Sequence, residues 1–155
     1  MHPTVARVAG ILEAAGWTGE VRELSDSTRT AAEAASALGC EVGAIASSLV
    51  FLADDEPLLV VTSGAHRVDT TRVAALLGVN EVGKAPASLV REATGYAIGG
   101  VPPLGHPAPL RTLVDVDLGQ HDAVWAAAGH PHAVFSTTFD ELVRLTGGAS
   151  AEVGE

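Results

Sequence analysis

Cysteine, aromatic residues and charge are all scarce in this sequence. Its 155 residues include one cysteine, Cys40, which excludes an internal disulfide and a zinc site built from cysteines. Aromatic residues account for 4% and charged residues for 18% of the chain, against 47% hydrophobic residues. This composition excludes a disordered chain and predicts one domain with a core of small and branched aliphatic side chains.

Long hydrophobic runs are absent as well. The longest apolar stretches lie within residues 48–53 and 58–61 and are too short to span a bilayer. The first ten residues, MHPTVARVAG, lack the apolar segment of a signal peptide. The sequence therefore predicts a cytoplasmic protein with no membrane partner.

Positive charge is rare, and it is unevenly placed. The formal net charge is −10, which makes the chain a poor general binder of nucleic acid. Residues 62–111 nevertheless carry five basic and three acidic residues, which leaves +2 there and −12 elsewhere. Either this excess is an ordinary local fluctuation, or the middle of the chain is where a phosphate group binds.

Apolar periodicity, the capping residues Thr30, Asp69 and Thr138, and the glycines that end the helices predict the order of helices and strands. The predicted helices cover residues 3–15, 31–39, 69–78, 86–95 and 139–147, and the predicted strands cover residues 20–24, 48–53, 57–63, 110–116, 123–128 and 132–137. Strands occur both as hairpin neighbours and separated by helices, so we expect a single α+β domain with a mixed, mostly antiparallel sheet covered by helices. We expect the domain to occupy residues 1–148 and residues 149–155 to form a frayed tail.

The segment YAIGGVPPLGHPAP, residues 96–109, combines four prolines with three glycines. Gly99 and Gly100 allow the backbone to approach a ligand, and Pro102 and Pro103 stiffen the segment that follows. Amide N–H groups held in a fixed direction are what an oxyanion hole requires. The same composition is also typical of a rigid surface turn.

Two further segments carry polar side chains between predicted elements. GAHRVD, residues 64–69, joins a strand to a helix, a favourable place for an anion, although Asp69 is more simply a helix cap. In AAGHPH, residues 127–132, two histidines flank a proline, but no further ligand motif accompanies them. We therefore predict no metal and no cofactor.

Four stretches carry a resemblance to a known family through their content and their order. They are TAAEAASALGCEVGAIASSLVF, SGAHRVDTTRVAALLG, ATGYAIGGVPPLGHPAPLRTLVD and VWAAAGHPHAVFSTTFDELVRLTGG. Together they resemble the YbaK and prolyl-tRNA-synthetase-associated editing domain family over roughly residues 25–148. The third stretch contains the G-x-x-x-P motif of the family as Gly99 to Pro103.

The resemblance implies a metal-independent hydrolase that removes a small amino acid, such as alanine or cysteine, from mischarged tRNA-Pro or a related mispair. It implies the 3′ end of mischarged tRNA as a partner, with prolyl-tRNA synthetase and a second copy of the chain as further candidates. The alternative is a non-catalytic module of the same fold that senses a small amino-acid-like ligand or a protein partner.

The resemblance also assigns candidate roles to residues. Gly99, Gly100 and Pro103 would grip the aminoacyl carbonyl, and His130, after Gly129, would lie beside the amino-acid pocket. Ser47 stands where many members carry a lysine that meets the terminal phosphate, so we expect Arg67 to supply part of that charge. The candidate catalytic residues are Gly99, Gly100 and Ser47. The candidate substrate-binding residues are Ser48, His66, Arg67, Val101, Pro102, Pro103, His106, Asp115, Gly129 and His130.

Overall fold

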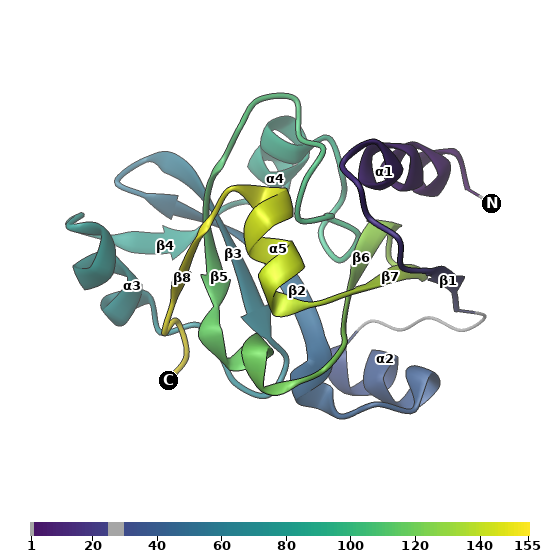
Figure 1. The fold of residues 1–155 in the computed structure, drawn as a ribbon. Coiled ribbons are helices and arrows are strands. Elements are labelled where there is room, and N and C mark those ends of the chain that lie inside the picture. Colours follow the sequence, from purple (N-terminus) through teal and green to yellow (C-terminus); the bar gives the residue numbers. More distant parts are fainter. Residues whose placement is uncertain (1, 25–29) are drawn as a thin grey trace.

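The computed structural model describes residues 2–24 and 30–155, and within them five α-helices surround one mixed sheet (Figure 1). The α-helices are α1 (Pro3–Ala14), α2 (Ala31–Leu38), α3 (Thr70–Leu77), α4 (Ala87–Thr94) and α5 (Phe139–Thr146). The strands are β1 (Val21–Glu23), β2 (Ile45–Ala53), β3 (Glu56–Ser63), β4 (Val82–Lys84), β5 (Arg111–Asp115), β6 (Val124–His130), β7 (Ala133–Thr137) and β8 (Ala149–Ala151). Short 3₁₀ helices, η1 (Val42–Ala44) and η2 (Val116–Gln120), precede β2 and follow β5.

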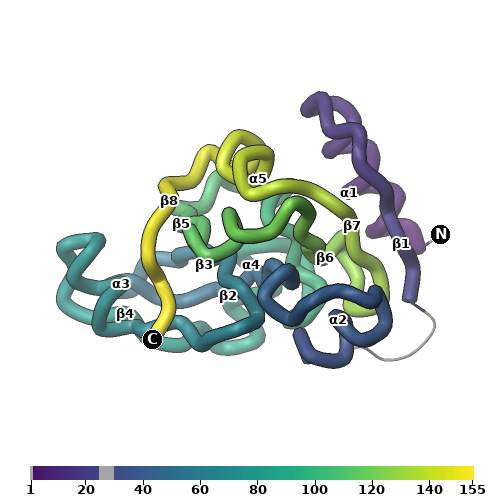
Figure 2. Tube along the Cα trace, turned by 60° about the horizontal axis from the view of Figure 1, so that its bottom comes forward, coloured from purple at the N-terminus to yellow at the C-terminus, as the bar shows by residue number. Residues whose placement is uncertain are grey.

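The sheet confirms the predicted mixed α+β class. Its strands follow the order β1-β7-β6-β2-β3-β5-β8, and β4 pairs with β2 outside this path. Within the described residues four strand pairs are antiparallel and three are parallel. Figures 1 and 2 place α1 and β1 at one end of the molecule and α3 and β4 at the other.

Strand β2 is the central strand of this sheet, because it pairs with three other strands. One edge of β2 is paired with β3 from Ala46 to Ala53. The other edge pairs with β6 only at Ile45 and Ala46, and with β4 only from Phe51 to Ala53. Residues 47–50 therefore have no neighbouring strand on this second edge within the described part of the chain.

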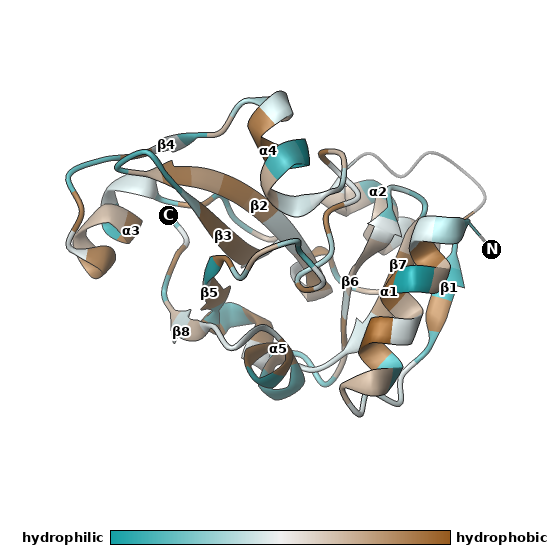
Figure 3. Ribbon diagram, turned by 90° about the horizontal axis from the view of Figure 1, so that it is seen from above, coloured by the Kyte–Doolittle hydropathy of each residue, from teal (hydrophilic) through white to brown (hydrophobic). Residues whose placement is uncertain are grey.

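Alternate residues of β3 pack into different cores, as the period of a strand requires. Leu59 and Val61 pack with α1, α5 and β6, whereas Leu58 and Val60 pack with α3 and β4. Figure 3 shows hydrophobic colouring along much of β2 and β3 in the middle of the molecule. None of the helices within the described residues is long and apolar enough to cross a membrane.

The helix ends follow the predicted signals. The side chains of Thr30, Asp69 and Thr138 accept hydrogen bonds from the backbone N–H groups three residues later, at 3.1 Å in each case. Four helices, α2, α3, α4 and α5, end at a glycine in the left-handed conformation. These signals are local, which is why the sequence predicts them correctly.

The prediction of a frayed tail at residues 149–155 is wrong. Residues 149–151 form β8, which pairs in parallel with β5, and Val153 is fully buried. The tail continues with a bridge between Val68 and Gly154. The edge of β5 and the second core, which includes Val153, hold this segment in place.

Replacing Val153 by alanine tests whether the tail belongs to the core. The substitution should lower the free energy of unfolding by about 2 kcal/mol, because it removes two buried methyl groups and leaves a cavity. Urea denaturation measures this loss. Glu152→Ala is the control, since it removes only an exposed ion pair with Arg72 and should change stability by less than about 0.5 kcal/mol. Equally small effects of both variants would favour the frayed tail.

Candidate functional site

A cavity of about 490 Å³ lies beside the unpaired part of β2. Its wall is formed by α2, β2, the end of β4, α4, the turn at residues 98–101, and β6 and β7. The described lining residues include Ser47, Ser48, Leu49, Lys84, Ile98, Gly99, Val101, Trp125 and Pro131. Most of the remaining lining is alanine, valine and other apolar side chains, so the cavity suits a compact ligand with a few polar groups.

The unpaired part of β2 presents main-chain groups to this cavity. Ile45 accepts a hydrogen bond from Gly64 on the β3 side, and the N–H of Asp54 donates to Glu81 on the opposite side. Because successive residues of a strand point their N–H and C=O groups to alternate edges, those of Ser48 and Val50 point into the gap between β6 and β4. The cavity therefore contains backbone donors and acceptors that a ligand can use.

The glycine loop reaches the cavity through a tight turn. The N–H of Gly100 donates to the carbonyl of Ala97 at 3.0 Å, and Gly99 has a φ of 90° that favours glycine. Gly99 and Val101 line the cavity, and their N–H groups have no acceptor among the described residues. The donors available to an oxyanion are therefore those of Gly99 and Val101, and the N–H of Gly100 is already used within the turn.

Gly100 has a steric role that the sequence did not indicate. A Cβ atom at this position would lie 3.1 Å from the Cα of His130 and from the Cδ of Pro131. The absence of a side chain therefore lets the loop sit on the turn between β6 and β7. The contact with a substrate carbonyl expected of Gly100 stays a prediction beside this packing role.

The two serines of β2 face different surroundings. Ser47 lies opposite Thr62 of β3, on the same face of the sheet as Phe51. Ser48 lies on the opposite face, and its hydroxyl is buried without a hydrogen-bond partner among the described residues. This hydroxyl is closed off from the cavity, so Ser48 contributes its main-chain groups and not its hydroxyl to the cavity wall.

Lys84 is the one charged residue among the described residues that line the cavity. Arg67 lies outside this lining: its carbonyl accepts a hydrogen bond from the N–H of Glu155, and Val68 pairs with Gly154. The position of Arg67 against the C-terminal segment does not support the expectation that it supplies positive charge to the site. Lys84 is the cation that the structure places there instead.

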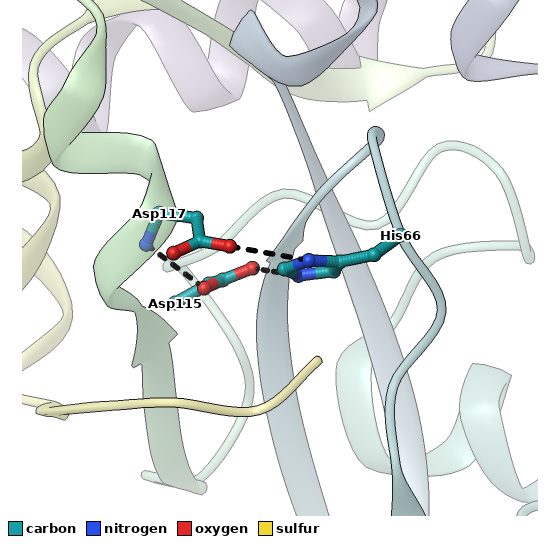
Figure 4. Close-up of side chains that lie close together, drawn as sticks. All are labelled: His66, Asp115 and Asp117. Atoms are coloured by element: carbon teal, nitrogen blue, oxygen red, sulfur yellow. Dashed lines mark hydrogen bonds and ion pairs between the residues drawn. The ribbon is translucent and has the colours of Figure 1, made fainter. Parts of the chain in front are cut away.

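His66 and Asp115 belong to a polar network outside the cavity lining, at the end of β5 (Figure 4). The Nε2 atom of His66 lies 2.5 Å from Oδ2 of Asp115, and its Nδ1 atom lies 3.2 Å from Oδ2 of Asp117. The fully buried Asp115 also accepts hydrogen bonds from the N–H groups of Ser63 and Asp117, at 2.9 and 3.0 Å. This network fastens the turn after β3 to η2, which gives His66 and Asp115 a structural role.

Gly129 and His130 face α1 and not the cavity. A Cβ atom on Gly129 would lie 2.9 Å from Val8 and 3.0 Å from the carbonyl of Thr4. The ring of His130 lies 4.7 Å from that of His2. Desolvation and the nearby His2 and His132 lower the pKa of His130. Only Pro131 of this turn reaches the cavity, so the predicted contact of His130 with an amino-acid pocket is not present in this geometry.

The proline-rich end of the glycine loop also supports structure. His106 lies 2.8 Å from the carbonyl of Pro102 through its Nε2 atom, and burial lowers the pKa of His106. His106 and Pro103 line a second, smaller cavity of about 210 Å³, which shares no lining residue with the larger cavity. These contacts support the glycine loop through Pro102, Pro103 and His106, which do not line the larger cavity.

The cavity thus gathers four of the predicted residues, Ser47, Ser48, Gly99 and Val101. Sequence reasoning missed Lys84, Leu49, Ile98 and Trp125, which come from three strands and a turn. Two of them carried a signal, because Leu49 and Ile98 are large apolar side chains that remain 40% and 59% exposed. Trp125 is covered on one side by Arg22, whose guanidinium carbon lies 4.7 Å from the ring centre.

Comparison with protein families supports the resemblance. The sequence model described as "Aminoacyl-tRNA editing domain" matches residues 25–145. "Uncharacterized protein YwhH" of Bacillus subtilis is 30% identical over 124 residues, which cover 79% of this chain and 78% of that protein. "Putative Cys-tRNA(Pro)/Cys-tRNA(Cys) deacylase EbsC" of Enterococcus faecalis is 26% identical over 130 residues, 83% of this chain and 79% of that protein.

Parts of longer proteins and solved structures are also similar to this chain. A proline–tRNA ligase of Leuconostoc mesenteroides is 34% identical over 71 residues, which cover 46% of this chain and only 12% of the ligase. A crystal structure of a "putative trans-editing enzyme for prolyl tRNA synthetase" shares 46% identity and a TM-score of 0.94, covering 100% of this chain and 99% of the other. "Hypothetical protein APE2540" shares 33% identity and a TM-score of 0.88, covering 96% of this chain and 99% of the other.

Removing divalent ions tests whether the His66 network is a metal centre. Ligand atoms of His66, Asp115 and Asp117 lie within 4.8 Å of one another, so the group has the composition of a small metal site. Both ring nitrogens of His66 already lie against carboxylates, and an ion would have to displace these contacts. We therefore expect EDTA to leave the melting temperature and the activity unchanged. Loss of either with EDTA, and its recovery with zinc, would identify a metal centre.

Replacing Gly100 by alanine tests the steric role of this glycine. The added methyl group would press on the backbone of His130, so we expect a loss of about 1–3 kcal/mol in the free energy of unfolding. Gly10→Ala is the control, because a Cβ there meets nothing within 4 Å and should stabilise α1 by up to about 1 kcal/mol. Urea denaturation compares the two variants. Full stability of Gly100→Ala together with lost activity would instead indicate direct substrate contact.

Proposed function

The chain belongs to the aminoacyl-tRNA editing domain family, and we propose that it is a free-standing deacylase that hydrolyses the ester bond of mischarged tRNA. The cavity beside β2 carries this proposal. It brings two main-chain N–H groups without described acceptors, those of Gly99 and Val101, to the wall of an otherwise apolar space. Such fixed donors stabilise the negative charge that develops on an ester carbonyl during hydrolysis.

The proposed reaction needs little more than positioning. A water molecule attacks the carbonyl carbon of the aminoacyl ester, the bond between this carbon and the ribose oxygen breaks, and a proton passes to the ribose oxygen. No histidine or carboxylate is present among the described lining residues, so the neighbouring ribose hydroxyl of the substrate is our candidate for moving the proton. The N–H groups of Gly99 and Val101 hold the carbonyl, and the apolar wall limits the access of bulk water.

We propose a small amino acid, such as alanine or cysteine, on tRNA-Pro or on a related mispaired tRNA as the substrate. The names of two similar proteins, "Putative Cys-tRNA(Pro)/Cys-tRNA(Cys) deacylase EbsC" and "putative trans-editing enzyme for prolyl tRNA synthetase", support this class. The 3′ end of the tRNA is then the direct partner. Prolyl-tRNA synthetase and a second copy of this chain are further candidate partners.

A non-catalytic binding module is the second candidate. Two points support it: the described lining contains no histidine or carboxylate that could act as a general base, and the family resemblance places Ser47 where many members carry a lysine. Such a module would bind an amino-acid-like ligand in the same cavity without turnover.

Deacylation of a panel of aminoacyl-tRNAs separates these two functions. We expect alanine or cysteine to be released from tRNA-Pro faster than proline. Ala127→Phe fills the cavity and should reduce the rate by about a hundredfold, because the ester can no longer reach its position. Leu76→Phe, on the exposed face of α3 and outside the lining, should leave the rate unchanged. Binding of the same substrates without hydrolysis of any of them would favour the non-catalytic module.

A further inference from the structure

Lys84 is a cation whose charge is not neutralised by its neighbours. Three arginines of the described chain form ion pairs, Arg22 with Glu20, Arg72 with Glu152 and Arg144 with Glu141. Lys84 is exposed and, like the other four described arginines, has no such partner among the described residues, although the net charge of the chain is −10. It is also the one cation of the described cavity lining.

The local fold fixes the position of Lys84 in the cavity. Lys84 is the last residue of β4, where it pairs with Phe51 of β2. The carboxylate of Asp54 holds the start of β4 by accepting the N–H groups of Asn80 and Glu81, at 3.0 and 2.9 Å. Because β4 ends at Lys84, this residue stands where the unpaired part of β2 begins.

The start of α4 adds positive potential at the same place. Pro86 is the N-cap of α4 and has no side chain that can accept a hydrogen bond from the first turn. The first N–H groups of a helix carry a partial positive charge, and here they begin three residues after Lys84. Both contributions favour an anion at this end of the cavity.

We propose that Lys84 is the anion-binding residue of the cavity and that it contacts the phosphate on the 5′ side of the terminal adenosine of aminoacyl-tRNA. This proposal rests on the proposed function. The aminoacyl end of the substrate carries a positive α-ammonium group and a negative phosphate, and Lys84 repels the first and attracts the second.

The positive charge at one end of the cavity and the carbonyl group further along β2 then set the direction in which the substrate lies. The phosphate lies at the β4 end, beside Lys84. The ammonium group lies further along β2, where the carbonyl of Ser48 points into the gap between β6 and β4. Ammonium groups are donors only, so this acceptor suits that end of the substrate.

Two analogues that cannot be hydrolysed separate the phosphate contact from the rest of the site. One is an amide-linked alanyl-CCA oligonucleotide, which carries phosphates, and the other is amide-linked alanyl-adenosine, which carries none. Their dissociation constants are measured with the wild type, Lys84→Met, Lys84→Arg and Arg111→Met. Arg111 is exposed and lies outside the cavity lining, which makes it a matched control for net charge.

We expect Lys84→Met to weaken binding of the oligonucleotide about tenfold and to leave binding of alanyl-adenosine unchanged. The slope of log Kd against log salt should fall by about 0.7, the value for one phosphate on a single strand. Lys84→Arg should keep the affinity, and Arg111→Met should match the wild type.

Other outcomes overturn the proposal in different ways. Equal weakening of both analogues by Lys84→Met would mean that Lys84 acts on the shape of the cavity and not on a phosphate. An unchanged salt slope would exclude Lys84 as the phosphate contact. If the phosphate-dependent effect is found but aminoacyl-tRNA esters are not hydrolysed, the deacylase function fails and the anion site stands.

Discussion

The incomplete pairing of β2 is the constraint on which the site depends. A fully paired strand would bury the N–H and C=O groups of Ser48 and Val50 in hydrogen bonds to a neighbour. Because β6 leaves β2 after Ala46 and β4 joins it only at Phe51, these groups remain open between two strands. The sheet thereby supplies a rigid wall with unsatisfied main-chain groups, and α2, α4 and the glycine loop need only close the space around it.

Features encoded by neighbouring residues could be predicted from the sequence. The caps at Thr30, Asp69 and Thr138 and the terminal glycines of the helices were correct, because a cap and the amide it bonds are three residues apart. The three-residue strands β4 and β8 were missed, because they are too short to show alternation and exist only through pairing with β2 and β5.

The same distinction between local and long-range contacts applies to the candidate site. Residues next to one another in sequence, such as Gly99 and Gly100, were singled out from composition, but the position of each depended on distant partners. Gly100 packs against the turn between β6 and β7, and Arg67 is hydrogen-bonded to the C-terminal segment. Both partners are distant in the sequence. Lys84 was overlooked because its importance comes from the position of β4 beside β2, which nothing in residues 82–84 reveals.

The open edge of β2 also bears on how the molecule avoids unwanted association. Free strand edges commonly serve as templates on which strands of other molecules assemble into aggregates. Here the free edge is enclosed in the plane of the sheet by β4 and β6, and it extends over residues 47–50 only. A strand from another chain would need a longer run of free edge to pair stably, whereas a compact ligand needs no more than these few groups. The same enclosure that creates the binding wall therefore keeps this edge of β2 from pairing with a strand of another molecule.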